Sequence, residues 1–180
     1  KNLGYKNIIC FFKKKLNLLD QKKVESFLKK KKPKLVIIAA ARVGGILANN
    51  NNKASFLYEN LTIQTNIIHG SFLAGVKNLI FLGSSCIYPK KTKQPIKESF
   101  FMTGPLENTN DAYAIAKITG VKMCMEYSKQ YKLNYKTLMP ANMFGANDNY
   151  DLSSSHFFPA LIRKIHNAKI RKKKFITLWG

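Results

Sequence analysis

The sequence predicts an α/β fold, in which a doubly wound parallel β-sheet has flanking helices. Short, nearly continuous apolar runs recur along the chain, which is typical of strands buried on both faces. Single helix patterns separate consecutive runs, as expected for right-handed crossovers between parallel strands. With 180 residues, of which 46% are hydrophobic, the chain is long enough for one domain with a sizeable core.

The first half of the chain alternates strand and helix patterns. The expected strands are residues 7–12, 35–40 and 79–82, and the expected helices are residues 21–31 and about 54–74. Asp20 can cap the first helix, and Pro33 ends it. Gly44, Gly45 and the asparagine run at residues 49–52 predict a loop before the second helix.

The second half continues the alternation after a long loop. We expect a loop over residues 84–110, a helix over about 111–131, a strand at 135–139, a helix at 156–168 capped by Ser155, and the start of a strand at 175–178. Parallel sheets bind ligands beyond the carboxyl ends of their strands. The loops after Ala40, Leu82 and Met139 are therefore the predicted ligand-binding edge.

The formal net charge of +22 raises a different class of function, a lysine-rich nucleic-acid-binding domain. Such domains usually concentrate arginine, whose planar fork reads phosphate and guanine. Here only three of the 31 basic residues are arginine, and the lysines are spread along the chain. We therefore favour solvated lysine-rich faces and expect no nucleic-acid partner.

No membrane or secretory signal is visible. The longest apolar runs fall well short of the roughly 18 to 20 residues that span a bilayer, and the chain shows no targeting pattern. We expect a cytoplasmic protein with no membrane association.

The cysteines Cys10, Cys86 and Cys124 form no CxxC pair, which argues against a disulfide framework or a zinc ribbon. We expect reduced thiols, with Cys10 and Cys124 in the core, and no metal site.

Tyr113 and Lys117 are candidates for proton transfer. They lie four residues apart on a predicted helix and so share a face. A neighbouring ammonium favours the phenolate and lowers the tyrosine pKa from its usual value near 10. The pair can then exchange a proton with a carbonyl undergoing reduction, while Ser84, at a strand end, can hydrogen-bond that carbonyl. The alternative is a solvated surface pair, because a lysine-rich chain contains this spacing by chance.

Three blocks of sequence resemble the extended short-chain dehydrogenase/reductase family, and within it the GDP-L-fucose synthases. The blocks are AAARVGGI at residues 39–46, LGSSCIYP at 82–89 and YAIAK at 113–117, and residues 142–149 and 153–159 continue the likeness. The resemblance covers essentially all 180 residues. It implies a Rossmann-like domain that binds NADP, in which residues 150–180 lead into the substrate-binding part and form no separate second domain.

The resemblance also implies a two-part reaction. GDP-4-keto-6-deoxy-mannose is epimerised at C3 and C5, and its 4-keto group is then reduced by NADPH. Tyr113, Lys117 and Ser84 match the reductive residues, and Cys86 and His156 match the acid and base of the epimerisation. A thiol and an imidazole suit that work because both titrate near neutrality when modestly perturbed. His69 and His166 are expected to be structural or exposed, and the full-length protein is expected to be a homodimer.

Two rival enzymes share this fold, a nucleotide-sugar 4-epimerase and a 4,6-dehydratase. Neither needs a thiol at position 86, so Cys86 favours the synthase. The cofactor contacts that the resemblance implies are Lys13, Ala40, Leu82, Gly83, Ser84, Ser85, Lys117, Pro140, Ala141, Asn142, Met143 and His156. Lys13 favours NADP independently, because a basic residue after that strand accommodates the 2′-phosphate. Lys164 and Trp179 match substrate contacts, and whether Arg163 or Lys164 points inward is open.

One expected part of such a domain is missing from the chain. There is no GxxGxxG or GxGxxG turn for the cofactor pyrophosphate, and the first pattern reads as a second strand. We therefore expect a fragment of a longer enzyme that lacks the first strand and the glycine-rich turn. Because backbone N–H groups at that turn normally hold the pyrophosphate, the fragment alone should bind NADPH weakly and be inactive.

Overall fold

The computed structural model describes residues 4, 7–10 and 14–178, apart from the side chain of Leu47. Its elements, in chain order, are α1 Gln21–Lys31, β1 Leu35–Ile38, α2 Ile46–Asn51, α3 Lys53–Leu73, β2 Asn78–Leu82, α4 Asp111–Tyr131, β3 Asn134–Leu138 and α5 Phe157–Ile170. The long loop before α4 contains two 3₁₀ turns, Ser85–Ile87 and Glu98–Phe100.

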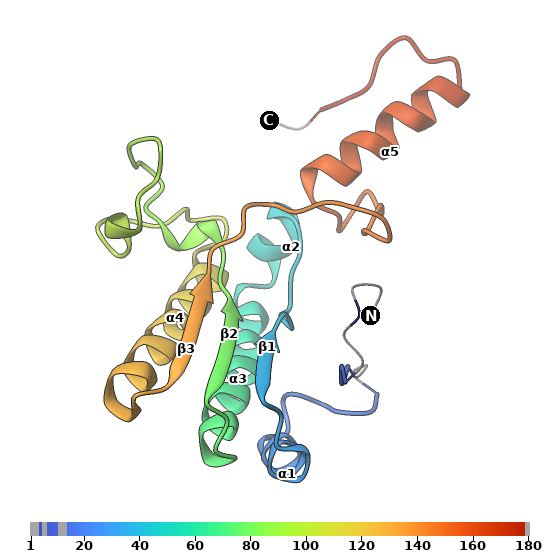
Figure 1. Cartoon of the computed structure of the whole chain (residues 1–180). Helices are drawn as coiled ribbons and strands as arrows, with labels where there is room; N and C mark the ends of the chain where they lie inside the picture. The colour runs from blue at the N-terminus through green and yellow to red at the C-terminus, as the bar shows by residue number, and fades with distance from the viewer. Residues whose placement is uncertain (1–3, 5–6, 11–13, 179–180) are drawn as a thin grey trace.

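The three strands form one parallel sheet in the order β1-β2-β3 (Figure 1). Leu35 pairs with Asn78, and Asn78 pairs with Asn134, so the amino ends of the strands are level. Helices link consecutive strands, as crossovers between parallel strands require. The predicted α/β class and parallel sheet are confirmed.

One face of the sheet carries the core. α3 and α4 lie side by side against it, and α1 packs on α3 (Figure 1). The buried cluster between these layers consists of Val24, Leu28, Ile38, Ile67, Ile68, Leu79, Phe81, Ile87, Val121, Cys124 and Tyr135. Asp20 caps α1 by accepting a hydrogen bond of 3.1 Å from the Lys23 backbone N–H, as predicted.

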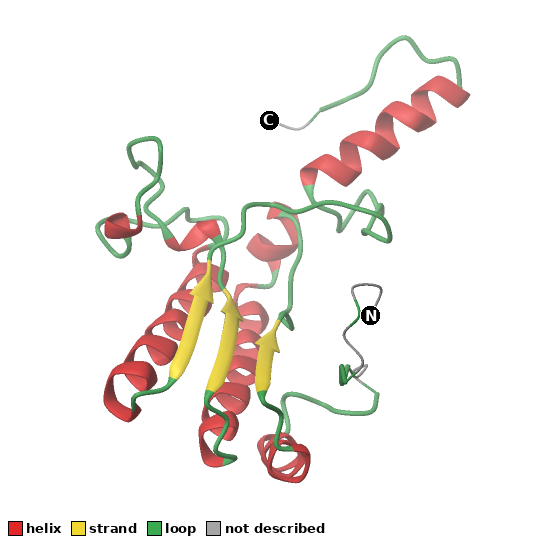
Figure 2. Cartoon of the chain, viewed as in Figure 1, coloured by secondary structure: helices red, strands yellow, loops and turns green. Residues whose placement is uncertain are grey.

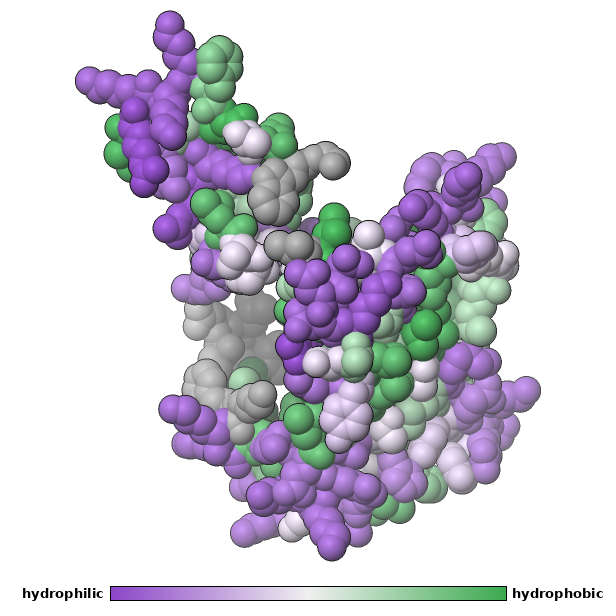
Figure 3. All heavy atoms as spheres, turned by 180° about the vertical axis from the view of Figure 1, so that it is seen from behind, coloured by the Kyte–Doolittle hydropathy of each residue, from purple (hydrophilic) through white to green (hydrophobic). Residues whose placement is uncertain are grey.

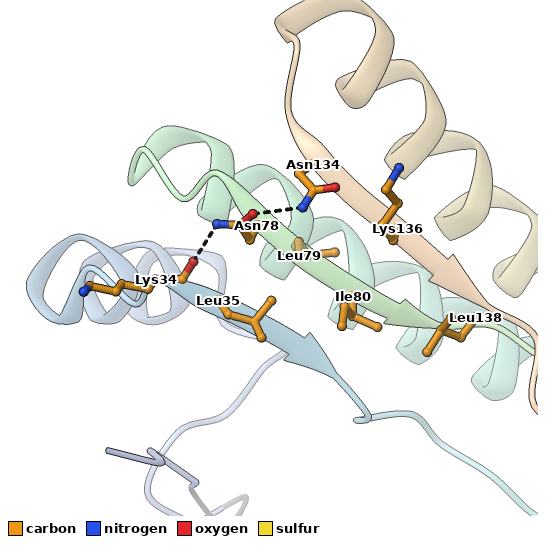
Figure 4. Close-up of a pocket in the computed structure, with 8 residues that line it drawn as sticks. All are labelled: Lys34, Leu35, Asn78, Leu79, Ile80, Asn134, Lys136 and Leu138. Atoms are coloured by element: carbon orange, nitrogen blue, oxygen red, sulfur yellow. Dashed lines mark hydrogen bonds between the residues drawn. The ribbon is translucent and has the colours of Figure 1, made fainter. Parts of the chain in front are cut away.

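The opposite face of the sheet is uncovered in the part of the chain that the structure describes. Leu35, Ile37 and Leu138 are 46%, 59% and 51% exposed. Figure 4 shows Leu35, Ile80 and Leu138 beside a hollow of about 580 Å³ on this face. Asn78 ties the amino ends of the strands together, since it donates to the Lys34 carbonyl at 3.2 Å and its Oδ1 accepts from Asn134 Nδ2 at 3.0 Å.

α5 stands away from the sheet, at the end of an irregular segment that follows β3 (Figure 2). Seen from behind, hydrophilic residues cover much of the part that protrudes at the top and the lower part of the rest of the molecule, and hydrophobic residues lie between them (Figure 3). On this face, hydrophilic residues are thus spread over several parts of the chain. Among the described residues, no helix is both long enough and apolar enough to cross a membrane.

The predicted strand at residues 7–12 is wrong where the structure describes it. Residues 7–10 have no regular structure, and residues 11–12 lie outside the described part. A strand needs a hydrogen-bonded neighbour, and this segment joins no ladder of the described sheet. Ile8, Ile9 and Cys10 are consequently exposed, which corrects the expectation that Cys10 is a core thiol.

Three further expectations need correction. The loop expected around Gly44 contains the short helix α2, where Asn49 Nδ2 donates to the carbonyls of Gly44 and Gly45 at 2.7 and 3.1 Å. Ser155 does not cap α5, because the capping position falls on His156 and the buried Ser155 hydroxyl has no hydrogen-bond partner among the described residues. Residues 175–178 form no strand, because they pair with none of the described strands.

Candidate active site at the carboxyl ends of the strands

The parallel sheet brings the three predicted loops to one edge. Leu82 ends β2 and Leu138 ends β3, and the two residues are paired in the ladder. Gly83 continues this pairing, with its N–H donating to the Leu138 carbonyl at 2.8 Å. A Cβ at Gly83 would lie 2.5 Å from Met139 Sδ and 3.2 Å from the Leu138 carbonyl oxygen, so a larger residue would crowd the two strand ends and displace the Met139 side chain.

Ser84 and Cys86 begin the loop after β2. The Ser84 Oγ accepts a hydrogen bond of 3.4 Å from the Cys86 backbone N–H and so caps the first 3₁₀ turn. Cys86 is half-buried, and burial raises the pKa of its thiol, while Ser84 and Lys117 act in the opposite direction. The thiol therefore lies close enough to Lys117 for their charges to interact.

α4 supplies Tyr113 and Lys117 to the same edge. Lys117 is only 4% exposed, and its Nζ donates to the Leu82 carbonyl at 2.7 Å. The same nitrogen lies 5.6 Å from the centre of the Tyr113 ring and 4.8 Å from the centre of the Phe81 ring. The structure thus brings the two predicted α4 residues together at the end of β2, with Cys86 beside them.

The predicted lowering of the tyrosine pKa is wrong for this structure. Burial, with a smaller contribution from Cys86, raises the pKa of Tyr113 to about 12. Burial also lowers the pKa of Lys117 to about 8. Desolvation disfavours the charged form of each group, and the Lys117 ammonium points at a backbone carbonyl instead of the phenol. At neutral pH Tyr113 therefore keeps its proton and can act as a proton donor, and Lys117 loses its proton more readily than an exposed lysine does.

Of the other expected cofactor residues, those that follow the strands lie at the same edge, His156 precedes α5, and Lys13 is beyond the described part. Ala40 lies exposed just after β1, and Ala141, Asn142 and Met143 lie exposed in the irregular segment after β3. Lys13 is outside the described residues, so its expected contact with a 2′-phosphate is a prediction only. The described residues contain no group of three or more histidine, cysteine, aspartate or glutamate side chains that could hold a metal ion.

The residues expected to hold substrate lie on α5, away from the sheet. His156 immediately precedes α5 and is partly exposed. Lys164 Nζ donates to the Thr177 carbonyl at 2.8 Å, whereas Arg163 lines a different hollow, of about 430 Å³, with His166. The two basic neighbours thus face different surroundings, and Trp179 lies outside the described residues.

Sequence reasoning missed two buried amides on α3. Asn60 is 3% exposed and Gln64 is 2% exposed, and both lie on the apolar face that packs toward the core. Asn60 holds the Arg42 peptide in the loop after β1, and Gln64 binds the Ala116 carbonyl on α4. The signal was a pair of amides four residues apart, on the helix face that also carries Phe56, Ile67 and Ile68.

Comparison with known proteins gives consistent matches. Residues 6–180 match the sequence profile of the NAD dependent epimerase/dehydratase family. The GDP-L-fucose synthase of Sinorhizobium fredii is 54% identical over 173 residues, which are 96% of this chain and 55% of that protein. The GDP-L-fucose synthase of Escherichia coli is 47% identical over 165 residues, covering 92% of this chain and 51% of that protein.

Solved structures agree with the sequence matches. A GDP-6-OMe-4-keto-L-xylo-heptose reductase from Campylobacter jejuni superposes with a TM-score of 0.89 at 41% identity, over 94% of this chain and 48% of that one. An NADP-bound GDP-L-fucose synthetase from Naegleria fowleri gives 0.84 at 29% identity, over 96% and 56%. The chain therefore spans about half the length of these relatives, and it belongs to the NAD dependent epimerase/dehydratase family.

Proposed function

We propose that the full-length protein carries out NADPH-dependent 3,5-epimerisation and 4-keto reduction of GDP-4-keto-6-deoxy-mannose, which yields GDP-L-fucose. The observation that carries this proposal is the grouping of Cys86, Tyr113 and Lys117 at the carboxyl end of β2. Relatives named GDP-L-fucose synthase, at 54% and 47% identity, support the choice of reaction. A cytoplasmic location belongs to the same proposal.

The described residues fit the nicotinamide end of the cofactor, which would lie at the carboxyl edge of the sheet. The edge of the sheet presents exposed backbone after β1 and β3, and Lys117 is a buried amine beside the strand that lies between them. Ala40, Gly83 and the segment 140–143 would line the cofactor, and Lys117 would hydrogen-bond its nicotinamide ribose. NADPH, when bound, supplies the hydride for C4 of the sugar.

The chain's own residues supply the proton chemistry in this proposal. Epimerisation beside a ketone needs a base to remove the C3 or C5 proton and an acid to return one to the opposite face. Cys86 and His156 take these two roles. In the reduction, Ser84 orients the 4-keto oxygen and Tyr113 donates its proton to that oxygen as C4 accepts the hydride. The raised pKa of Tyr113 keeps its proton available for this step.

The same relatives support a GDP-sugar as the substrate. Lys164 and Trp179 are proposed to bind the GDP part of the sugar nucleotide, with Arg163 as the alternative cation.

A homodimer is part of the proposal, and the exposure of Tyr58, Ile115 and Met125 on α3 and α4 supports it, because helices with exposed apolar side chains are common at interfaces. Sedimentation of the full-length protein at several concentrations tests the dimer.

Two variants of the full-length protein test the division of roles. Tyr113→Phe should abolish NADPH oxidation while solvent deuterium still enters C3 and C5, as read by mass spectrometry. Cys86→Ser should impair that exchange. Tyr127→Phe is the matched control, because Tyr127 lies on the same helix but hydrogen-bonds His69 at 2.8 Å. Equal loss of both half-reactions in both site variants, with folding intact, would count against the assigned roles.

A substrate comparison tests the sugar. GDP-4-keto-6-deoxy-mannose should be reduced faster than a GDP-4-keto-heptose, the type of sugar named for the Campylobacter relative. The reverse preference would keep the reductase chemistry and reject the proposed substrate.

A further inference from the structure

A buried amide on α3 reaches the backbone of α4 next to Lys117. Gln64 is 2% exposed, and its Nε2 donates to the Ala116 carbonyl at 2.5 Å. Ala116 is fully buried and directly precedes Lys117. In an α-helix this carbonyl already faces the N–H four residues later, at Gly120. The Gln64 amide therefore adds a donor from outside the helix, one residue before the predicted catalytic lysine.

The same amide also lies beside α4 one turn further along. A Cβ built at Gly120 would lie 2.9 Å from Gln64 Oε1, and it would lie 2.5 Å from Cζ of Phe81 on β2. Gln64 thus binds α4 at Ala116 and fills the space beside Gly120, where Phe81 of β2 also packs. Packing of this tightness leaves α4 little freedom to slide or to turn about its axis.

The position of α4 determines what Lys117 can reach. Its Nζ lies 2.7 Å from the Leu82 carbonyl and 4.8 Å from the centre of the Phe81 ring, so both partners belong to β2. Tyr113 lies one turn before Lys117 on the same helix. A shift of α4 relative to β2 would therefore move both proton-transfer residues away from Ser84 and Cys86 together.

From these contacts we infer that Gln64 is a positioning residue, which fixes α4 on β2 so that Tyr113 and Lys117 meet the end of that strand. The inference deepens the proposed function and rests on it, because the reduction is the step that the placement serves. In this role Gln64 does not touch the reacting atoms of Tyr113 or Lys117. It acts only through the backbone of α4.

The chain offers a matched control two residues away. Asn66 is 7% exposed, and its Nδ2 donates to the Leu18 carbonyl at 2.9 Å. Like Gln64, it is a buried amide of α3 that binds a distant backbone carbonyl, but its partner precedes α1. Gln64→Met and Asn66→Leu each remove one such hydrogen bond with little change in volume, and only the first touches α4.

The experiment compares both variants with the unaltered full-length protein in two measurements. For Gln64→Met we expect kcat for NADPH oxidation to fall about tenfold with KM within about twofold, since sub-ångström misplacement slows chemistry more than binding. Lys117, observed by NMR of ¹³Cε-labelled lysine and assigned by its loss in Lys117→Met, should titrate about half a unit higher, because a loosened helix admits water. Asn66→Leu should change neither value.

The two measurements separate the outcomes. Unchanged kcat and Lys117 titration in Gln64→Met would overturn the inference, and so would equal changes in Asn66→Leu, which would indicate only a general loss of stability. The Lys117 titration needs no substrate. If the unaltered protein fails to reduce the sugar nucleotide but Gln64→Met alone shifts the titration, the proposed function is wrong and the positioning role stands.

Discussion

Lys117 Nζ donates a 2.7 Å hydrogen bond to the carbonyl of Leu82, the last residue of β2. This contact holds a cation in the interior, and burial lowers the pKa of Lys117 to about 8. A group whose folded pKa is depressed contributes stability above its unfolded pKa, near 10.5, and that stability is lost as pH falls through the folded value. Near neutral pH, the charge on Lys117 therefore works against folding.

Replacing this lysine should stabilise the chain. Lys117→Met removes the buried charge and should raise the free energy of unfolding at pH 7 by about 1–3 kcal/mol, after allowance for the lost hydrogen bond. The gain should shrink as pH rises from 8 toward 10. Urea unfolding at pH 7, 8, 9 and 9.5 measures it, within a range where Tyr113, with its pKa raised to about 12, stays neutral. A gain that is the same at every pH would contradict the buried-charge explanation.

Gly120→Ala should destabilise the chain although alanine favours helices. The new Cβ would meet Phe81 Cζ at 2.5 Å, and overpacking of a core by one methyl group costs about 1–3 kcal/mol. Urea unfolding reports the change. Gly145→Ala is the control, because nothing lies within 4 Å of a Cβ there, and its midpoint should be unchanged. If Gly120→Ala is as stable as the unaltered chain, the close approach of α4 to β2 is wrong.

Asn60 should hold the loop after β1 in place. Its Oδ1 accepts from the Arg42 N–H at 2.8 Å, and its Nδ2 donates to the Arg42 and Phe56 carbonyls at 3.0 and 2.8 Å. Asn60→Leu leaves the Arg42 peptide without these partners and should cost about 2–3 kcal/mol. Hydrogen exchange of the Arg42 amide should also accelerate. Thr62→Val, which removes only a local bond to the Tyr58 carbonyl, should leave that amide protected.

The uncovered face of the sheet should bind apolar probes. Ile37 is 59% exposed there, on the same face of the sheet as Leu35 and Leu138. Ile37→Lys should lower the fluorescence of a bound naphthalene-sulfonate dye and reduce light scattering on concentration, because it divides the apolar surface with a charge. Ile170→Lys is the control, since Ile170 is 67% exposed but lies at the end of α5. The same decrease in both variants would show that added charge alone is responsible.

Local signals explain what could be predicted from the sequence. The helix expected at about 111–131 is α4, Asp111–Tyr131, and Asp20 caps α1, because spacing and capping residues act over a few positions. The segment at 7–12 carries an equally clear apolar run, but a strand also needs a partner that the run itself does not specify. Local periodicity was therefore enough for the helices and insufficient for this strand.

In the candidate site, too, local features could be predicted from the sequence, and features that depend on distant parts of the chain could not. Tyr113 and Lys117 are brought together as their spacing predicts, and Cys86 joins them through the parallel sheet. The direction of the Tyr113 pKa shift was not predictable, because it depends on how much protein surrounds the phenol and on where the Lys117 ammonium points. Gln64 was missed because a polar residue within an apolar face gives no indication of which backbone it will reach.

The order of the strands in the sheet is their order along the chain, and this has a consequence for synthesis. β2 can pair with β1 as soon as α3 has been made, and β3 can then add to the free edge of β2 after α4. None of the three described strands must be inserted between two that have already paired. During synthesis, the strands can therefore be added to this sheet one after another at the same edge. Tyr113 and Lys117, on α4, would then pack against β2 before β3 pairs with it.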